Sequence, residues 1–170
     1  MSITAALPPY GVLDQPAVQC IAEAAHRYEV PELLLHAIVS KENGRTGQCV
    51  RNRNGSQDCG LAQINTAWAP HFARYGIMQH HITHHACTNL TAAAYILKKY
   101  QIRKGGDWFK AVVSYNIGPN EWTAKRYPIG HRYAVDVIGR WQRLHSYVVQ
   151  LHHHHLAQQA ATAHPPAAQP

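Results

Sequence analysis

The sequence lacks any apolar run approaching the roughly 18 residues that a membrane-spanning helix requires. Charged residues are also few, because Asp, Glu, Lys and Arg make up only 15% of the 170 residues while 46% are hydrophobic. This composition is typical of a globular protein and excludes both a disordered chain and a helical membrane protein. Domains cluster near about 100 to 150 residues, so we expect one domain.

Acidic residues are especially scarce. Nine Asp and Glu stand against sixteen Lys and Arg, which gives a formal net charge of +7, and fourteen His add positive charge at lower pH. A basic protein favours polyanionic partners such as nucleic acid, but the chain has no helix-turn-helix, zinc-finger or RNA-binding signature and its positive charges are scattered. We therefore expect no nucleic-acid partner, and an anionic polymer such as the bacterial cell wall suits the charge equally well.

The four cysteines, Cys20, Cys49, Cys59 and Cys87, show no CxxC spacing, which argues against a zinc site or a thioredoxin-like site. Two disulfides are the favoured interpretation, with three possible pairings, and four free thiols in a cytoplasmic protein are the alternative. Disulfides need an oxidising compartment, yet residues 1–15 show neither the basic nor the apolar region of a signal peptide. We expect a periplasmic or exported protein with no metal and no cofactor.

Apolar periodicity predicts a mainly α protein with a small β element. Glycines between residues 44 and 60, together with the Asn54-Gly55 pair, predict an irregular β-hairpin. Proline, glycine and capping signals on either side of the apolar periods set the expected helix bounds. The predicted helices begin after Asp14 and at Pro31, and then cover about 66–75, 88–104, 108–116 and 131–150.

The predicted domain covers residues 14–150, after an N-terminal segment of residues 1–13. Residues 151–170 are first rich in His and then in Ala, Gln and Pro, without apolar periodicity, which predicts a disordered tail. The His152–His155 run has three interpretations, a metal site, an expression tag or a solvated helix end, and we favour the solvated end because more chain follows it.

Glu42 is the first candidate for chemistry. It lies four residues after Ile38 and three after Val39, so its carboxyl group is on the apolar side of the predicted second helix, near its end. Burial disfavours a carboxylate and raises its pKa, which suits a general acid. The alternatives are an ion pair with Arg45 or Arg53, or exposure at a frayed helix end.

Asp58 follows sixteen residues later, within the sequence NGSQDCGLAQIN. A hairpin that returns beside the end of the preceding helix can place this second carboxyl group across a cleft from Glu42. Two carboxyl groups in different surroundings hold different protonation states at one pH, which is what glycosidic bond cleavage requires. The alternative is that Asp58 forms an Asx-type turn with the residues that follow it.

Three motifs in order carry a resemblance to a known family. Glu42 is followed by NGSQDCGLAQINTAW at 54–68, by Cys-Thr-Asn at 87–89 and by AVVSYNIGP at 111–119. This pattern, across residues 15–145, resembles the lytic transglycosylase domain that accompanies conjugation, pilus and type III or IV secretion systems. The hairpin motif is also similar to that of C-type lysozymes, so the resemblance implies a lysozyme-like fold.

The resemblance implies peptidoglycan as substrate. Glu42 would protonate the glycosidic oxygen between N-acetylmuramic acid and N-acetylglucosamine, and its carboxylate would then take the proton of the muramic 6-hydroxyl as this group closes a 1,6-anhydro ring. Asp58 would stabilise oxocarbenium charge. The residues that would contact substrate are Gln63, Asn65, Tyr115 and Asn116. From the residues alone, Gln63 could instead bond hairpin backbone and Tyr115 could be a core residue.

Two positions depart from the family pattern, Asn43, where many relatives have Ser, and Ala62, where most have Met. The second departure predicts the loss of an apolar wall of the sugar cleft.

The resemblance further implies the disulfide pairs Cys20–Cys87 and Cys49–Cys59, a secretion or conjugation apparatus as partner, and a monomer. Two other functions stay open. A hydrolytic muramidase would use Glu42 and Asp58 with water in place of the 6-hydroxyl, and a non-catalytic module would bind the wall without cleaving it.

Overall fold

A computed structural model describes residues 15–163, with side chains placed for 17–159; the predicted N-terminal segment and residues 164–170 of the predicted tail lie outside the described residues. The fold is mainly helical with one small sheet, which confirms the predicted class. The helical elements are α1 (Gln15–Tyr28), α2 (Glu32–Glu42), the 3-10 helix η2 (Thr66–Trp68), α3 (Ala69–Ala73), α4 (Gln79–His84), α5 (Ala86–Arg103), α6 (Trp108–Ile117) and α7 (Tyr127–Ala163).

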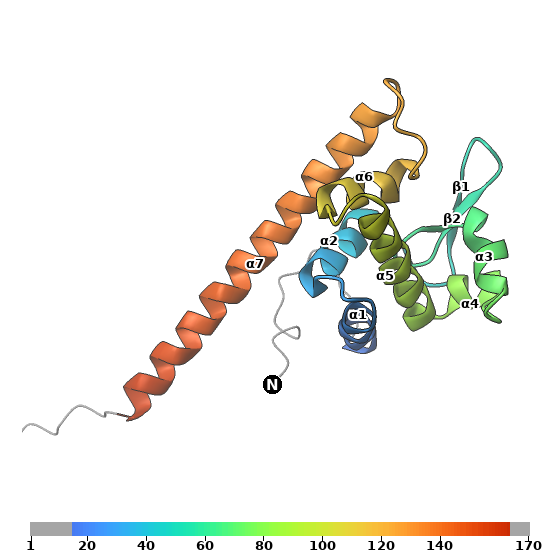
Figure 1. Ribbon diagram of the computed structural model, residues 1–170. Helices are drawn as coiled ribbons and strands as arrows, with labels where there is room; N and C mark the ends of the chain where they lie inside the picture. The colour runs from blue at the N-terminus through green and yellow to red at the C-terminus, as the bar shows by residue number, and fades with distance from the viewer. Residues whose placement is uncertain (1–14, 164–170) are drawn as a thin grey trace, which may run out of the picture.

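The core is built where these helices cross. α1 packs on α5, α5 packs on α6, and both α2 and α6 pack on α7. Helix α2 is the most enclosed, because every residue from Leu34 to Val39 is buried. In Figure 1 the central helices α2, α5 and α6 lie between α7 and the sheet with α3 and α4. The middle of α2 is therefore enclosed by the fold, and its carboxyl end, from Ser40 to Glu42, is partly buried.

Local signals explain several helix ends. The Asp107 side chain accepts a hydrogen bond from the Lys110 backbone N–H at 3.0 Å, so it caps α6 as predicted. Pro31 lies one position before α2, as its N-cap, rather than at the first helical position. At the other end, Asn43 adopts the left-handed conformation with φ 49° and stops α2 directly after Glu42. Asn is among the few residues that tolerate this conformation.

The sheet contains three short antiparallel strands, β1 (Cys49–Arg51), β2 (Gln57–Cys59) and β3 (Ile64–Asn65), in the order β1-β2-β3. The predicted hairpin supplies β1 and β2, and β3 is an addition that the sequence did not indicate. Asp58 pairs with Val50 on one side and with Asn65 on the other. The central strand thus holds Asp58 from both sides.

The structure forms the two disulfides that the resemblance implied. Cys20–Cys87 ties α1 to α5, and Cys49–Cys59 joins directly opposed residues of β1 and β2.

Asn89 attaches the sheet to α5. Its side chain is 1% exposed and accepts a hydrogen bond from the Ala62 N–H at 2.8 Å. It donates to the carbonyl oxygens of Cys59 and Ile82, both at 2.9 Å. Gly60, with φ +74°, packs so closely that a Cβ atom there would collide with the Asn89 amide. One buried amide therefore joins β2, the turn before β3 and the end of α4.

Helix α7 corrects one prediction. The sequence predicted a disordered tail from residue 151, but α7 continues to Ala163. Missing apolar periodicity shows only that no helix face is buried, while Ala, Gln and Leu are good helix formers that extend a helix already nucleated. Figure 1 shows α7 running past the other helices into open space. Within residues 15–163, no helix is both long and apolar enough to cross a membrane.

Candidate active site

Glu42 is the last residue of α2 and is partly buried. The hydroxyl group of Tyr133, on α7, donates a hydrogen bond to Glu42 Oε1 at 2.5 Å. The pKa of Glu42 is raised from 4.5 to about 7, chiefly by burial. The Tyr133 hydrogen bond opposes this rise, the negative charge of Asp58 adds to it, and the charge of Lys41 lowers the pKa. Near neutral pH this carboxyl group is therefore present in both protonated and ionised forms.

Asp58 has polar surroundings. Its Oδ1 accepts a hydrogen bond from the Asn65 amide at 2.7 Å, and its Oδ2 accepts one from the Asn52 amide at 2.9 Å. Both amides also donate to the Ser56 hydroxyl, at 3.0 and 3.2 Å. The side chain of Asn65 is fixed in turn, because its oxygen accepts the Ala67 N–H at 2.9 Å. A network of neutral donors thus holds both carboxylate oxygens in place.

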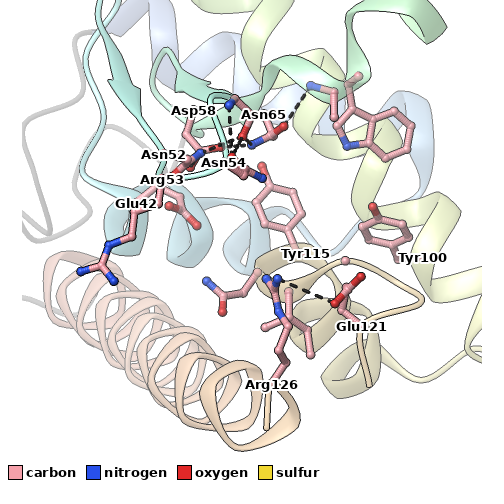
Figure 2. Close-up of a pocket in the computed structure, with 16 residues that line it drawn as sticks. Glu42, Asn52, Arg53, Asn54, Asp58, Asn65, Tyr100, Tyr115, Glu121 and Arg126 are labelled. Carbon is pink, nitrogen blue, oxygen red and sulfur yellow. Dashed lines mark hydrogen bonds and ion pairs between the residues drawn. The ribbon is translucent and has the colours of Figure 1, made fainter. Parts of the chain in front are cut away.

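Glu42 and Asp58 line the same cleft, which has a volume of about 600 Å³. In Figure 2 the hairpin forms one side of the cleft, and the segment between α6 and α7 forms the opposite side. The cleft is lined by Glu42, Asn52, Arg53, Asn54, Ser56, Asp58, Asn65, Ala67, Trp68, Tyr100, Tyr115, Asn116, Ile117, Gly118, Glu121 and Arg126.

The structure brings together all but one of the predicted site residues. Gln63 is absent from the cleft lining. It has a left-handed backbone conformation, φ 48°, and its side-chain amide donates to the Gly60 carbonyl oxygen at 2.9 Å. In the structure Gln63 therefore bonds backbone next to the hairpin, as the alternative interpretation of this residue described. Ala62 also lies outside the lining and is fully buried, and the loss of an apolar cleft wall at this position stays a prediction.

Two tyrosines border Glu42. Tyr115 donates its hydroxyl hydrogen to the Ala62 carbonyl oxygen at 2.9 Å, which ties α6 to the turn before β3. Burial, followed by the charge of Glu42, raises the pKa of both Tyr115 and Tyr133 well above the usual value. Both phenols therefore stay neutral in the pH range where Glu42 titrates, and Tyr133 stays a hydrogen-bond donor.

Tyr133 was not predicted as a site residue, although it lies within the helix predicted over residues 131–150. A usable signal existed, because a buried tyrosine hydroxyl usually finds a hydrogen-bond partner. The sequence could not name that partner, which lies 91 positions away. Trp68 and Tyr100 were also missed as lining residues.

Four histidines gather at α4, and none of them lines the cleft. They are His80, His81 and His84 within the helix and His85 directly after it. In the part of the chain that the structure describes, no group of three or more His, Cys, Asp and Glu could hold a metal ion.

The cleft holds a partly buried carboxyl group with a raised pKa and a second, hydrogen-bonded carboxyl group. This arrangement resembles that of glycosidase sites. The family described as Transglycosylase SLT domain matches residues 19–132. The chain belongs to this family, as the motifs predicted.

Three relatives support the assignment. Protein IpgF of Shigella flexneri is 32% identical over 126 residues, which cover 74% of this chain and 80% of the relative. Invasion protein IagB of Salmonella typhimurium is 30% identical over 126 residues, covering 74% and 76%. X polypeptide of Escherichia coli is 33% identical over 103 residues, 60% of each chain.

Proposed function

We propose that this protein is a peptidoglycan lytic transglycosylase that cleaves the β-1,4 bond between N-acetylmuramic acid and N-acetylglucosamine. The observation that carries the proposal is Glu42, whose pKa is raised to about 7 at the edge of an open cleft. A general acid works best when its pKa is near the operating pH. Membership of the transglycosylase family supplies the substrate class.

In the first step, protonated Glu42 donates its proton to the glycosidic oxygen as the bond from that oxygen to the muramic C1 breaks. The N-acetylglucosamine side leaves as an alcohol, and positive charge develops on the muramic ring. In the second step, the Glu42 carboxylate takes the proton of the muramic 6-hydroxyl as its oxygen bonds to C1. The product is a 1,6-anhydro ring, Glu42 is protonated again, and no water is consumed.

Asp58 is proposed to stabilise the positive charge of the oxocarbenium-like state. Its two oxygens are held by Asn52 and Asn65 and it lines the same cleft as Glu42. A preorganised negative group next to developing positive charge lowers the barrier without reorganisation. Asn116, Tyr115 and Asn65 line the cleft and supply polar contacts for the sugars.

A hydrolytic muramidase is the second candidate, and Asp58 is the observation that favours it. Retaining glycosidases use one carboxyl group as acid and the other as nucleophile, with water completing the reaction. Both groups are present in this cleft. A wall-binding module without turnover is the weaker alternative, since binding alone gives no reason for a partly buried carboxyl group at a cleft edge.

The biological setting is also a proposal. One relative is named an invasion protein, and the motifs resemble those of domains that accompany secretion and conjugation systems. We propose that the enzyme acts on peptidoglycan in the periplasm and opens it locally so that such an apparatus crosses the wall.

Mass spectrometry of soluble products from purified peptidoglycan tests the chemistry. The wild-type protein should release 1,6-anhydromuropeptides, and Glu42→Gln should lower the rate by about 10² to 10⁴, the usual contribution of a general acid. Glu23→Gln, exposed on α1, is the matched control and should retain the wild-type rate. Products with reducing ends would identify the hydrolase instead, and equal release by the wild type and Glu42→Gln would remove Glu42 from its role.

A further inference from the structure

Arg53 is a cation in the cleft lining that has no ion-pair or side-chain hydrogen-bond partner among the described residues. The lining contains two arginines, Arg53 and Arg126. Arg126 lies 3.7 Å from Glu121, with which it forms an ion pair. The described residues offer Arg53 no ion pair and no side-chain hydrogen bond, and its side chain is exposed. In Figure 2 Arg53 extends from the hairpin side of the cleft, whereas Arg126 and Glu121 lie on the opposite side.

The turn that carries Arg53 is fixed by hydrogen bonds. Asn52 and Gly55 are joined by a backbone hydrogen bond of 3.1 Å, and the Asn52 N–H donates to the Ser56 carbonyl oxygen at 2.8 Å. The Asn54 side-chain oxygen accepts hydrogen bonds from the Ser56 N–H and hydroxyl, at 3.1 and 2.8 Å. A disulfide closes the base of the same hairpin. The backbone of Arg53 is thus preorganised beside the cleft, which lowers the entropy lost when its side chain binds a ligand.

The chemistry of the lining limits what Arg53 can bind. A guanidinium group pairs with carboxylates through two parallel hydrogen bonds. The lining also contains the carboxyl groups of Glu42, Asp58 and Glu121, which repel an anion elsewhere in the cleft. Among the described residues that line the cleft, the unpaired cation available to an anionic ligand group is therefore Arg53 at the hairpin turn.

We propose that Arg53 binds a carboxylate carried on the branch of the muramic acid residue, so that the enzyme distinguishes charged from neutral branches. The inference rests on the proposed function, because that function supplies the ligand. Two parts of the branch offer this chemistry: the stem peptide, and the lactyl group, whose carboxylate becomes free when the peptide is removed.

The neighbouring arginines provide matched controls. Arg45 and Arg51 are exposed, like Arg53, and belong to the same segment, but neither lines the cleft. A general effect of positive charge on an anionic polymer would involve all three residues alike. Specific recognition in the cleft would involve Arg53 alone.

The test is a titration of soluble glycan strands in the Glu42→Gln background, in which the expected loss of rate leaves the strands intact during the binding measurement. Adding Arg53→Gln should raise the Kd for peptide-bearing strands about tenfold, as expected for loss of a hydrogen bond between charged groups. Strands whose carboxylates have been converted to neutral amides should show less than about a twofold change. Adding Arg51→Gln should change neither Kd.

Strands stripped of peptide by an amidase identify the source of the carboxylate. The lactyl carboxylate is held in an amide bond while the peptide is attached, so an effect of Arg53→Gln that is lost in stripped strands assigns the stem peptide. An effect found only in stripped strands assigns the lactyl group, and an effect in both shows that Arg53 binds either carboxylate. Equal weakening for charged and neutral strands, or no weakening for either, overturns the inference. Product analysis with the wild-type protein is independent of this result: Arg53-dependent binding without any product would leave the inference standing and overturn the proposed reaction.

Discussion

Glu42 and Tyr133 are coupled at the level of single residues. Burial raises the pKa of Glu42 and the hydrogen bond from Tyr133 lowers it, and the net pKa is about 7. Without that bond the carboxylate is less stable, and the pKa rises further. Tyr133 therefore controls the upper end of the pH range in which Glu42 is protonated and able to act as an acid.

Tyr133→Phe tests this coupling. A general acid must begin protonated, so the wild-type kcat/KM should fall as the pH rises through about 7, the pKa of Glu42. In Tyr133→Phe this fall of kcat/KM, the alkaline limb of the pH profile, should move to higher pH. The profile is measured from about pH 4 to pH 9 on soluble glycan strands. Tyr147→Phe, further along α7, should leave the limb in place. A limb at the same pH in Tyr133→Phe would show that the hydroxyl does not act on Glu42.

The same pKa has a consequence for stability. The pKa of Glu42 is about 7 in the folded protein and 4.5 in the reference state, so between these values the folded protein keeps a proton that the unfolded chain has lost. The free energy of unfolding therefore declines as the pH rises from about 4.5 to about 7 and stays lower above it. The decline attributable to this residue is about 3 kcal/mol.

Glu42→Gln removes this titration while keeping an acceptor for Tyr133. Its Tm should match that of the wild type near pH 4 and exceed it by about 5 to 10 °C at pH 8. Glu23→Gln, on the surface of α1, should show no such dependence on pH. A Tm difference between Glu42→Gln and the wild type that stayed constant with pH would contradict the raised pKa.

Sequence patterns predicted the acid because its environment is largely local. The apolar residues Ile38 and Val39 precede Glu42 on one helix, and their burial places the carboxyl group against the core. Tyr133 lies on another helix, so no local pattern connects the two residues. Gln63 has the family motif but bends away through a left-handed backbone conformation, which side-chain spacing does not reveal.

At the level of elements, one side chain connects the helical body to the sheet. Asn89 is predicted to be the most sensitive polar residue outside the cleft, because its amide satisfies one N–H and two carbonyl groups. Asn89→Ala would leave these buried groups unpaired, at a cost of about 3 kcal/mol. Thermal unfolding should show a Tm lower by about 10 °C.

Asn120→Ala is the control for Asn89→Ala. Asn120 is exposed and accepts one hydrogen bond, from Arg103 at 2.7 Å on the surface, so its Tm should change by less than about 2 °C. Equal losses in both variants would mean that Asn89 does not join the sheet to the body.

The elements that sequence analysis missed are the short ones. Helix α4 has six residues and β3 has two, which is too short for an apolar period to be recognised. Both depend on contacts made elsewhere: Asn89 binds the Ile82 carbonyl oxygen of α4, and β3 exists by pairing with β2. The longer helices α1, α2, α5 and α6 were predicted because their own periodicity determines which face is buried.

At the level of the whole molecule, α7 has two functions along its length. Its first half supplies Tyr133 to the site and buries Ala134, Val137 and Leu144 against the other helices. Beyond Leu151, every residue to 159 is exposed. Burial on α7 therefore ends near residue 151, and the prediction of disorder from residue 151 was wrong for residues up to 163.

Truncation separates these two halves. A protein ending at Leu151 loses only exposed residues among those whose side chains are described, so its Tm should stay within about 2 °C of the full chain while helical ellipticity falls. A protein ending at Arg140 also loses Leu144, which is 3% exposed, and should be destabilised by at least about 3 kcal/mol. Product release should follow stability, unchanged in the first truncation and reduced in the second. A large Tm loss in the first would show that the projecting part of α7 contacts the body and is needed for the fold.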